Sequence, residues 1–195
     1  VSLSVSERMG RVMPSATSAV LGLAAELREA GRDVISLGAG EPDFDTPDHI
    51  KEAAIQAIRN GETKYTAIDG TSRLKAAIQR KFERDNQLNY SPDQILVSVG
   101  AKHTLFNACM AILSQGDEAI IPAPYWVSYP DMVRVAEGVP VVINTGIEDG
   151  FKVTPAKLEA AITDKTRLLF LNSPSNPTGS CYTRDELAAL GAVLL

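Results

Sequence analysis

The sequence predicts an α/β protein with a mainly parallel β-sheet and helices on both faces of that sheet. Short apolar segments alternate with amphipathic segments of helical periodicity from about residue 34 onward. Hydrophobic residues make up 45% of the 195 residues, which is enough to bury a core. Several of the apolar segments run into loops rich in Gly, Pro and Asn, and open α/β sheets place ligands at such strand ends.

Charge and cysteine content exclude several classes of protein. The 19 basic and 24 acidic residues are interspersed and give a net charge of −5, so no basic stripe favours nucleic acid. Cys109 and Cys181 form no CxxC pair, which predicts reduced thiols and no metal site. No apolar run could span a membrane, and the N-terminus lacks the apolar core of a signal peptide. We therefore expect a cytoplasmic protein without nucleic-acid or membrane partners.

The N-terminal part is expected to be an arm followed by a helix and a short strand. Residues 1–14 are polar and predict the arm. Ser15 or Thr17 can cap a helix that ends near Gly31. Residues 34–37 predict a strand, and the loop 38–42 follows it with two glycines and a proline. This loop is either an ordinary turn or a place where the backbone approaches a ligand closely.

Two further helices are expected before the next strand. The first begins at Asp45-Thr46-Pro47 and ends near Gly61, with Pro near its first turn. The second runs from Thr71 to about residue 86 and is amphipathic. Its apolar face is predicted to comprise Leu74, Ala77, Ile78 and Phe82, and its basic residues Lys75, Arg80, Lys81 and Arg84 to form a solvated face.

The stretch 94–107 predicts a strand, a tight turn and a helix. Alternating branched residues at 95–99 indicate the strand, and Gly100-Ala101 indicates the turn. Apolar residues at helical spacing then continue to Leu113. The free backbone N–H groups and the positive dipole end of such a turn suit a phosphate, although most strand-to-helix turns bind nothing.

The rest of the chain predicts three more helices alternating with three strands. Strands are expected at 119–121, 139–143 and 168–171. One helix is expected to end at Glu137, another to span 155–162 with Thr154 as its cap, and the third to begin after Thr183. Two prolines just before Trp126 restrict the backbone that presents its indole, which could stack on a flat ligand or belong to the core.

The last predicted strand leads into the sequence NSPSNPTG, residues 172–179. Asn176 stands directly before Pro177, so its backbone is restricted and its amide can be aimed. Thr183 and Glu186 form a capping box for a helix without a stop signal, which predicts a truncated chain. Loops at Gly40, Gly100, Trp126 and Asn176 are expected to gather along one edge of the sheet.

These motifs resemble the class I aminotransferases, pyridoxal-phosphate enzymes of fold type I, and most closely the bacterial aspartate aminotransferases of the one-gamma subgroup. The shared motifs, in family order, are LGAGEPDFDTP, GETKYT, SVGAKHTLFNA, PAPYWVSYP and NSPSNPTG. The resemblance implies an aminotransferase-like three-layer sandwich, present only in part. Residues 1–46 would form an N-terminal arm and small-domain segment, and residues 47–195 the N-terminal portion of the large cofactor-binding domain.

The resemblance also implies roles for individual residues. Backbone N–H groups of Gly100, Ala101 and Lys102 would bind the cofactor phosphate, and Trp126 would stack on the pyridine ring. Asn176 would hydrogen-bond the ring's phenolic oxygen. Tyr65 would reach the cofactor phosphate of the other subunit, which implies a homodimer with shared active sites. The Ala123-Pro124 and Asn176-Pro177 peptide bonds would be cis.

Substrate binding is implied for a second, overlapping set of residues. Gly40 would donate its backbone N–H to the substrate α-carboxylate, beside Trp126 and Asn176. Lys102, assisted by Ser15 and Thr17, would meet the distal carboxylate of a dicarboxylic substrate. The implied partners are therefore an amino acid and a 2-oxo acid.

The implied reaction is amino transfer between L-aspartate and 2-oxoglutarate by the full-length protein. The family places its Schiff-base lysine beyond Leu195, so no catalytic residue is expected in this chain, which alone should be inactive. Met13 stands where some relatives have a lysine associated with prephenate, which favours aspartate. The alternatives are an aminotransferase or lyase of this fold acting on aromatic, prephenate-like or neutral substrates, or a non-catalytic binding module.

Overall fold

The computed structural model describes residues 4–38 and 40–195, so residues 1–3 of the expected arm and Ala39 of the expected loop lie outside the described residues. The chain divides into two compact units. We call Val1–Gly38 with Leu105–Leu195 the sheet unit, and Ala39–Thr104 the helical unit. Each unit is described by itself.

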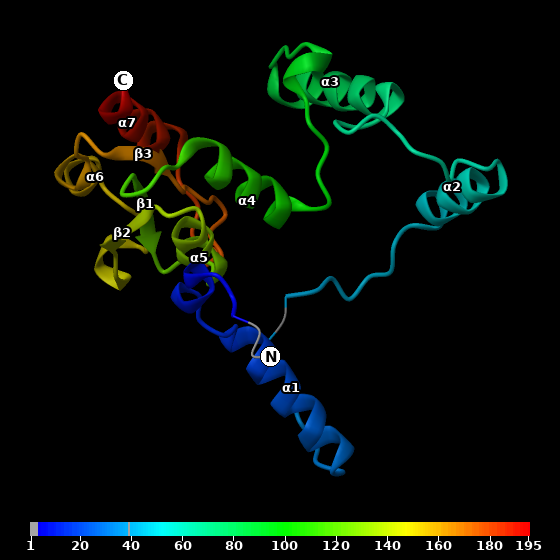
Figure 1. Cartoon of the computed structure of the whole chain (residues 1–195), viewed down its shortest axis with the longest axis horizontal. Coiled ribbons are helices and arrows are strands. Elements are labelled where there is room, and N and C mark those ends of the chain that lie inside the picture. The colour runs from blue at the N-terminus through cyan, green and yellow to red at the C-terminus, as the bar shows by residue number, and fades with distance from the viewer. Residues whose placement is uncertain (1–3, 39) are drawn as a thin grey trace. The chain divides into compact units, whose positions relative to one another are not determined.

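The sheet unit contains a three-stranded parallel sheet (Figure 1). Its strands are β1 (Glu118–Ala123), β2 (Val139–Asn144) and β3 (Thr166–Leu169), in the order β2-β1-β3. The central strand β1 is the most buried, because Ala119, Ile120 and Ile121 are fully covered. The predicted mainly parallel sheet is confirmed.

Helices pack on both faces of this sheet, as predicted (Figure 1). On one face, α4 (Ala101–Ile112) and α5 (Ser128–Val135) place Cys109 and Val133 in one apolar cluster with Ile121. On the other face, α6 (Pro155–Ala161) and α7 (Arg184–Leu194) contribute Leu158 and Leu190 to a cluster around Ile120. Successive residues of β1 thus serve opposite layers, as the pleat of a strand requires.

Side-chain caps fix three helix starts of the sheet unit where the sequence predicted them. Ser15 Oγ accepts the Ser18 N–H at 3.3 Å before α1 (Ala16–Glu29), and Thr154 Oγ1 accepts the Lys157 N–H at 3.3 Å before α6. The capping box of α7 is reciprocal: Glu186 N–H donates to Thr183 Oγ1 at 3.2 Å, and Thr183 N–H donates to Glu186 Oε2 at 2.7 Å. Short 3₁₀ turns are η1 (Glu7–Arg11) and η3 (Ile147–Asp149).

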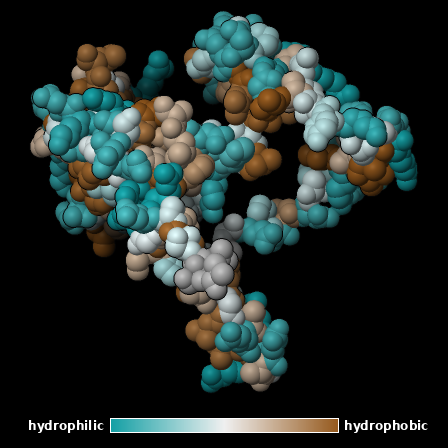
Figure 2. All heavy atoms as spheres, in the orientation of Figure 1, coloured by the Kyte–Doolittle hydropathy of each residue, from teal (hydrophilic) through white to brown (hydrophobic). Residues whose placement is uncertain are grey.

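The helical unit contains the two predicted helices α2 (Asp48–Arg59) and α3 (Ser72–Asn86) and the 3₁₀ turn η2 (Pro92–Gln94). Thr71 Oγ1 caps α3 by accepting the Leu74 N–H at 3.3 Å. Apolar side chains of this unit are largely exposed, and Figure 2 shows hydrophobic atoms on the surface of both helices. Among residues 40–104, only Lys75 and Ile95 are buried.

Two predicted strands are wrong. Residues 34–37 and 95–99 have no strand structure, and Ile35 and Leu37 are 87% and 93% exposed. A strand exists only where a neighbour accepts and donates its backbone hydrogen bonds. Within residues 95–99, the Val97 N–H donates a hydrogen bond to the Asp69 carbonyl at 3.0 Å, and Asp69 lies in a turn and not in a strand. The alternating apolar pattern was present, but the pairing that would make it a strand was not.

The interpretation of Lys75 as part of a solvated face is also wrong. Lys75 is 7% exposed, whereas Lys81 on the same helix is exposed and pairs with Asp85 at 3.3 Å. The Lys75 ammonium pairs instead with the Asp69 carboxylate, in the turn before α3. A lysine is buried only when its charge has a partner, and helical periodicity could not reveal a partner outside the helix.

Candidate functional site

A small pocket lies at the carboxyl ends of β1 and β3, where the two strands lead into loops. The first loop carries Tyr125 and the second carries Asn176. Ligands of open α/β sheets bind at this edge, because the strand ends deliver loops there from separate parts of the chain. The pocket is lined by Pro122, Pro124, Tyr125, Tyr129, Phe151, Phe170, Leu171, Asn172, Ser175, Asn176 and Tyr182.

Trp126, the single tryptophan, follows β1 in the first of these loops. Its ring meets Tyr129 edge-on, with centroids 5.5 Å apart and planes at 85°. Tyr129 in turn lies against Phe170, at 4.9 Å and 32°. Burial raises the pKa of Tyr129, so its phenol stays neutral at physiological pH. The half-buried indole is therefore packed against Tyr129 in a T-shaped pair, which restricts its orientation at this end of the sheet.

Asn176 is held by hydrogen bonds within its own loop. Its backbone N–H donates to Asn172 Oδ1 at 2.8 Å, and the Gly179 N–H donates to the Ser175 carbonyl at 2.8 Å. The Ala123-Pro124 and Asn176-Pro177 bonds are cis, as expected, and Ser173-Pro174 is a third cis bond that the sequence did not suggest. The Asn176 side chain is exposed at the pocket, where its amide can donate or accept.

Two residues that hold the Asn176 loop in place were not predicted from the sequence. Asn172 is the first Asn of NSPSNPTG, and its role as acceptor for Asn176 could have been suspected from the Asx-turn tendency of Asn. Tyr182 fastens the far end of the same loop: its backbone N–H donates to Ser173 Oγ at 3.0 Å, and its hydroxyl accepts the Val153 N–H at 2.8 Å. Burial raises the pKa of Tyr182. No sequence signal marks this tyrosine.

The start of α4 lies in the helical unit and is described by itself. Gly100 has φ +90°, and a Cβ built on it would meet nothing within 4 Å. The Thr104 N–H donates to the Gly100 carbonyl at 3.3 Å, which closes the first turn of the helix. That turn contains no acidic residue, so its positive dipole end is open to an anion. The Gly100 N–H itself donates to the Ser98 carbonyl at 2.8 Å.

The remaining predicted site residues lie in both units. Tyr65, Gly40, Ala101 and Lys102 are exposed residues of the helical unit, and the Tyr65 ring is fully exposed. In the sheet unit, Ser15 is used as the cap of α1 and Thr17 is partly buried on that helix. The structure brings the loops of Trp126 and Asn176 to one sheet edge. The expected gathering of Gly40 and Gly100 at that edge stays a prediction.

Other kinds of site find little support. Within residues 4–38 and 40–195, no cluster of three His, Cys, Asp or Glu could hold a metal ion. None of the helices in the described part of the chain is long and apolar enough to cross a membrane. Ser72 and Lys75 have the S-x-x-K spacing in which a lysine can serve a catalytic role. Lys75 is however buried and paired with Asp69, so it lies away from solvent.

The fold and the loops define an α/β protein with a small pocket at the carboxyl edge of a parallel sheet. More narrowly, the chain belongs to the class I and II aminotransferases, because the family described as "Aminotransferase class I and II" matches residues 32–194. This family uses pyridoxal 5'-phosphate as its cofactor.

Named relatives cover nearly the whole chain. It is 59% identical over 192 residues to an aspartate/prephenate aminotransferase of Nitrosomonas europaea, covering 98% of this chain and 48% of the relative. A protein of the same name from Cereibacter sphaeroides is 61% identical, with the same coverage. The solved aspartate aminotransferase from Rhizobium meliloti has a TM-score of 0.94 at 51% identity, covering 99% of this chain and 48% of that one.

A further solved structure is that of the Thermus thermophilus aspartate aminotransferase with maleate. It has a TM-score of 0.95 at 48% identity, covering 98% of this chain and 50% of that one. The chain therefore spans about half the length of the relatives it matches.

Proposed function

We propose that the protein containing this chain is an aspartate aminotransferase that transfers the amino group of L-aspartate to 2-oxoglutarate. The observation that carries the proposal is the pocket where β1 and β3 end, with the Trp126 loop on one side and the Asn176 loop on the other. An aromatic face and an adjustable amide at one sheet edge suit a flat, polar ring such as pyridoxal phosphate. When bound, that cofactor supplies an electron sink for the carbon that loses its proton.

Each part of the chain would have its own task in holding the cofactor. Trp126 would stack on the ring, with Tyr129 restricting the orientation of the indole through their T-shaped contact. Asn176 donates its amide to the phenolic oxygen, in a loop held by Asn172. The turn at Gly100, with the N–H groups of Ala101 and Lys102, binds the phosphate, as helix N-termini with no nearby acid do.

Substrate recognition is assigned to one charged residue, two hydroxyl residues and one glycine whose backbone could contact the substrate. Lys102 neutralises the distal carboxylate of the dicarboxylic substrate, with Ser15 and Thr17 assisting, and Gly40 meets the α-carboxylate. Lys102 is an exposed residue at the start of α4. The Thermus thermophilus aspartate aminotransferase was solved with maleate, a dicarboxylate, which agrees with this class of substrate.

The proposal also includes assembly and domain organisation. The fully exposed Tyr65 reaches the cofactor phosphate of a second subunit, so the active protein is a homodimer. The protein acts in the cytoplasm. Residues 1–46 belong to an arm and small-domain segment, and residues 47–195 to the large domain. The lysine that forms the imine with the cofactor is supplied from outside these 195 residues, so this chain alone does not transaminate.

The proposal is tested by steady-state kinetics of the complete protein and its Lys102→Ala variant. Because the Lys102 side chain is assigned to the distal carboxylate and its phosphate contact is through the backbone, KM for aspartate should rise about 10- to 100-fold, as expected for a lost hydrogen bond to a charged group. KM for an aromatic amino acid should change little. Lys81→Ala, which removes an exposed lysine paired with Asp85, is the matched control. An equal rise for both substrates would contradict the assignment of Lys102.

Prephenate is the second candidate amino acceptor. The relatives at 59% and 61% identity are named aspartate/prephenate aminotransferases. Prephenate also carries two carboxylates, so Lys102 could serve either substrate. Met13 is exposed, and it stands where some relatives have a lysine associated with prephenate. The absence of that lysine favours aspartate and 2-oxoglutarate over prephenate. Assays of the complete protein with prephenate and with 2-oxoglutarate as acceptor separate the two candidates.

A further inference from the structure

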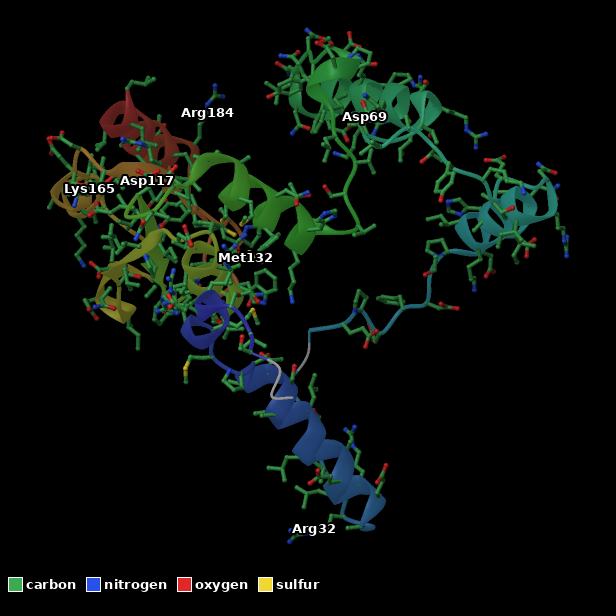
Figure 3. The ribbon with its side chains drawn as sticks, in the orientation of Figure 1. Arg32, Asp69, Asp117, Met132, Lys165 and Arg184 are labelled. Atoms are coloured by element: carbon green, nitrogen blue, oxygen red, sulfur yellow. The ribbon has the colours of Figure 1, made fainter. Side chains whose placement is uncertain are left out.

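We propose that Asp69, Gly70 and Lys75 form a clamp that positions the turn at Gly100 for phosphate binding, a role that rests on the proposed function of that turn. All the residues of this clamp and of the turn belong to the helical unit. Asp69 lies just before α3 (Figure 3). None of the three is expected to touch the cofactor, so they are positioning residues.

The ion pair between Lys75 and Asp69 ties α3 to the turn that precedes it. The Lys75 side chain is 9% exposed and the Asp69 side chain is 45% exposed. The Lys75 ammonium lowers the pKa of the Asp69 carboxyl, which therefore stays charged at neutral pH. A buried ammonium that lost this carboxylate would be left without a charge partner, which is strongly unfavourable. The position of Asp69 is thus set by the burial of Lys75.

The same turn is fastened to the segment that leads to Gly100. The Asp69 carbonyl accepts the Val97 N–H at 3.0 Å. Beside it, a Cβ built on Gly70 would lie 2.6 Å from Val97 Cγ2, closer than real Cβ atoms approach other atoms. Gly70 also has φ +109°, a conformation that side chains rarely allow. Only glycine lets the turn lie this close to Val97.

The helix α3 also holds the chain just before Val97. Gln79 Nε2 donates to the Tyr90 carbonyl at 2.7 Å, and the Phe82 and Tyr90 rings meet edge-on at 5.6 Å. The pKa of Asp93 is lowered mainly by a hydrogen bond from Ser91, and the charge of Lys75 adds to this effect. Tyr90 is therefore fixed to α3, and Val97 to the turn that precedes α3.

The clamp and the turn at Gly100 are joined by a very short segment. Only Ser98 and Val99 separate Val97 from Gly100, and the Gly100 N–H donates to the Ser98 carbonyl at 2.8 Å. A displacement of Val97 would therefore move the N–H groups at the start of α4. Hydrogen bonds to an anion weaken steeply with distance and angle, so a small movement there should reduce phosphate affinity.

The test compares pyridoxal phosphate with pyridoxal, which lacks the phosphate, as ligands of the complete apo-protein. Equilibrium dialysis gives Kd for wild type and for Lys75→Met, Lys75→Arg and Lys81→Met. Lys75→Met removes the buried charge and leaves Asp69 half-exposed to water, so it should fold. Lys75→Arg keeps the ion pair, and Lys81→Met is the matched control, because Lys81 pairs with Asp85 on the exposed side of α3.

We expect Lys75→Met to raise Kd for pyridoxal phosphate about tenfold and Kd for pyridoxal less than about twofold, in the range typical of coupling through packed residues. Lys75→Arg should restore most of the phosphate affinity, and Lys81→Met should behave as wild type. A purely structural role would weaken both ligands equally, and that result would overturn the clamp while leaving the phosphate site intact. Equal affinity of wild type for both ligands would overturn the phosphate role of the Gly100 turn itself.

Discussion

The sheet unit and the helical unit carry equally clear sequence patterns, yet residues 40–104 of the helical unit contain no β-strand. In the sheet unit, residues 119–120 pair with strands on both sides, Ile121 pairs with β2, and all three are fully buried. In the helical unit, residues 95–99 alternate in the same manner, but Leu96 is 61% exposed and Val99 is 87% exposed. The comparison teaches that an apolar alternation creates a strand only where neighbouring strands complete the pairing.

The two units also differ in how their helices are stabilised. α6 and α7 each bury a leucine, Leu158 and Leu190, under the sheet. α2 buries no residue, and Ile50 and Ile58 are 50% and 66% exposed. Isolated helices of this length are marginal in water, so tertiary packing distinguishes the stability of the two units.

The largest effect is expected from truncating the centre of the sheet. Ile120→Ala should lower the free energy of unfolding by about 2–5 kcal/mol, because Ile120 is fully buried between the strands and α6. Leu96→Ala, in the helical unit, should change it by less than about 0.5 kcal/mol. Urea unfolding followed by the fluorescence of Trp126, which lies in the sheet unit, measures Ile120→Ala, and urea unfolding followed by circular dichroism, which reports helix in both units, measures Leu96→Ala. Similar losses for the two variants would break the comparison.

A smaller effect is expected from removing matched helix caps. Thr183→Ala removes the cap of α7 and should cost about 1 kcal/mol in the same unfolding transition. Thr71→Ala removes an equivalent cap from α3, but the Trp126 transition should not shift, because α3 belongs to the other unit. Circular dichroism should instead report less helix for Thr71→Ala at 25 °C. A shift of the Trp126 midpoint by Thr71→Ala would show that the units unfold together.

The smallest effect is expected from acidification. Lys152 holds the pKa of Glu186 below its usual range, mainly through a hydrogen bond of 2.5 Å, and Lys157 does the same for Asp149 at 2.6 Å. Because the folded pKa lies below the unfolded one, this stabilisation is present above about pH 4.3, the usual value for Glu, and is lost as pH falls through the folded pKa. The urea midpoint of the sheet unit should therefore decrease between about pH 5 and pH 3.

Lys152→Met serves as the control for this pH effect. It removes the partner of Glu186 and should make the decrease in the midpoint shallower, without changing the Asp149 contribution. An unchanged pH profile in Lys152→Met would show that the Glu186 ion pair contributes nothing to stability, as is true of many exposed pairs.

Much of the fold could be predicted from sequence, because local signals fix helix starts. The caps at Ser15, Thr71, Thr154 and Thr183 bond one backbone N–H each within the first turn, and all four were foreseeable. Strands depend on partners distant in the chain, so residues 34–37 and 95–99 were mispredicted. The burial of Lys75 was missed for a similar reason, since its carboxylate partner lies outside the helix.

The parts of the candidate site that lie within recognisable motifs could be predicted from the sequence. The loops of Trp126 and Asn176 follow β1 and β3 as expected, and both expected cis bonds are present. The residues that hold those loops, Tyr129 and Tyr182, could not be predicted, because their contacts join segments that are separate in sequence. The roles of Gly40, Lys102 and Tyr65 stay predictions.

Hydrogen exchange on this 195-residue chain tests most directly whether the two alternating segments differ as described. The amides of residues 119–121 lie in the paired and buried part of β1 and should exchange slowly. Those of Leu96 and Val99 should exchange quickly, and Val97 should be slower than both because its N–H is bonded to Asp69. Slow exchange throughout residues 95–99, equal to that of β1, would contradict this account and indicate a paired strand.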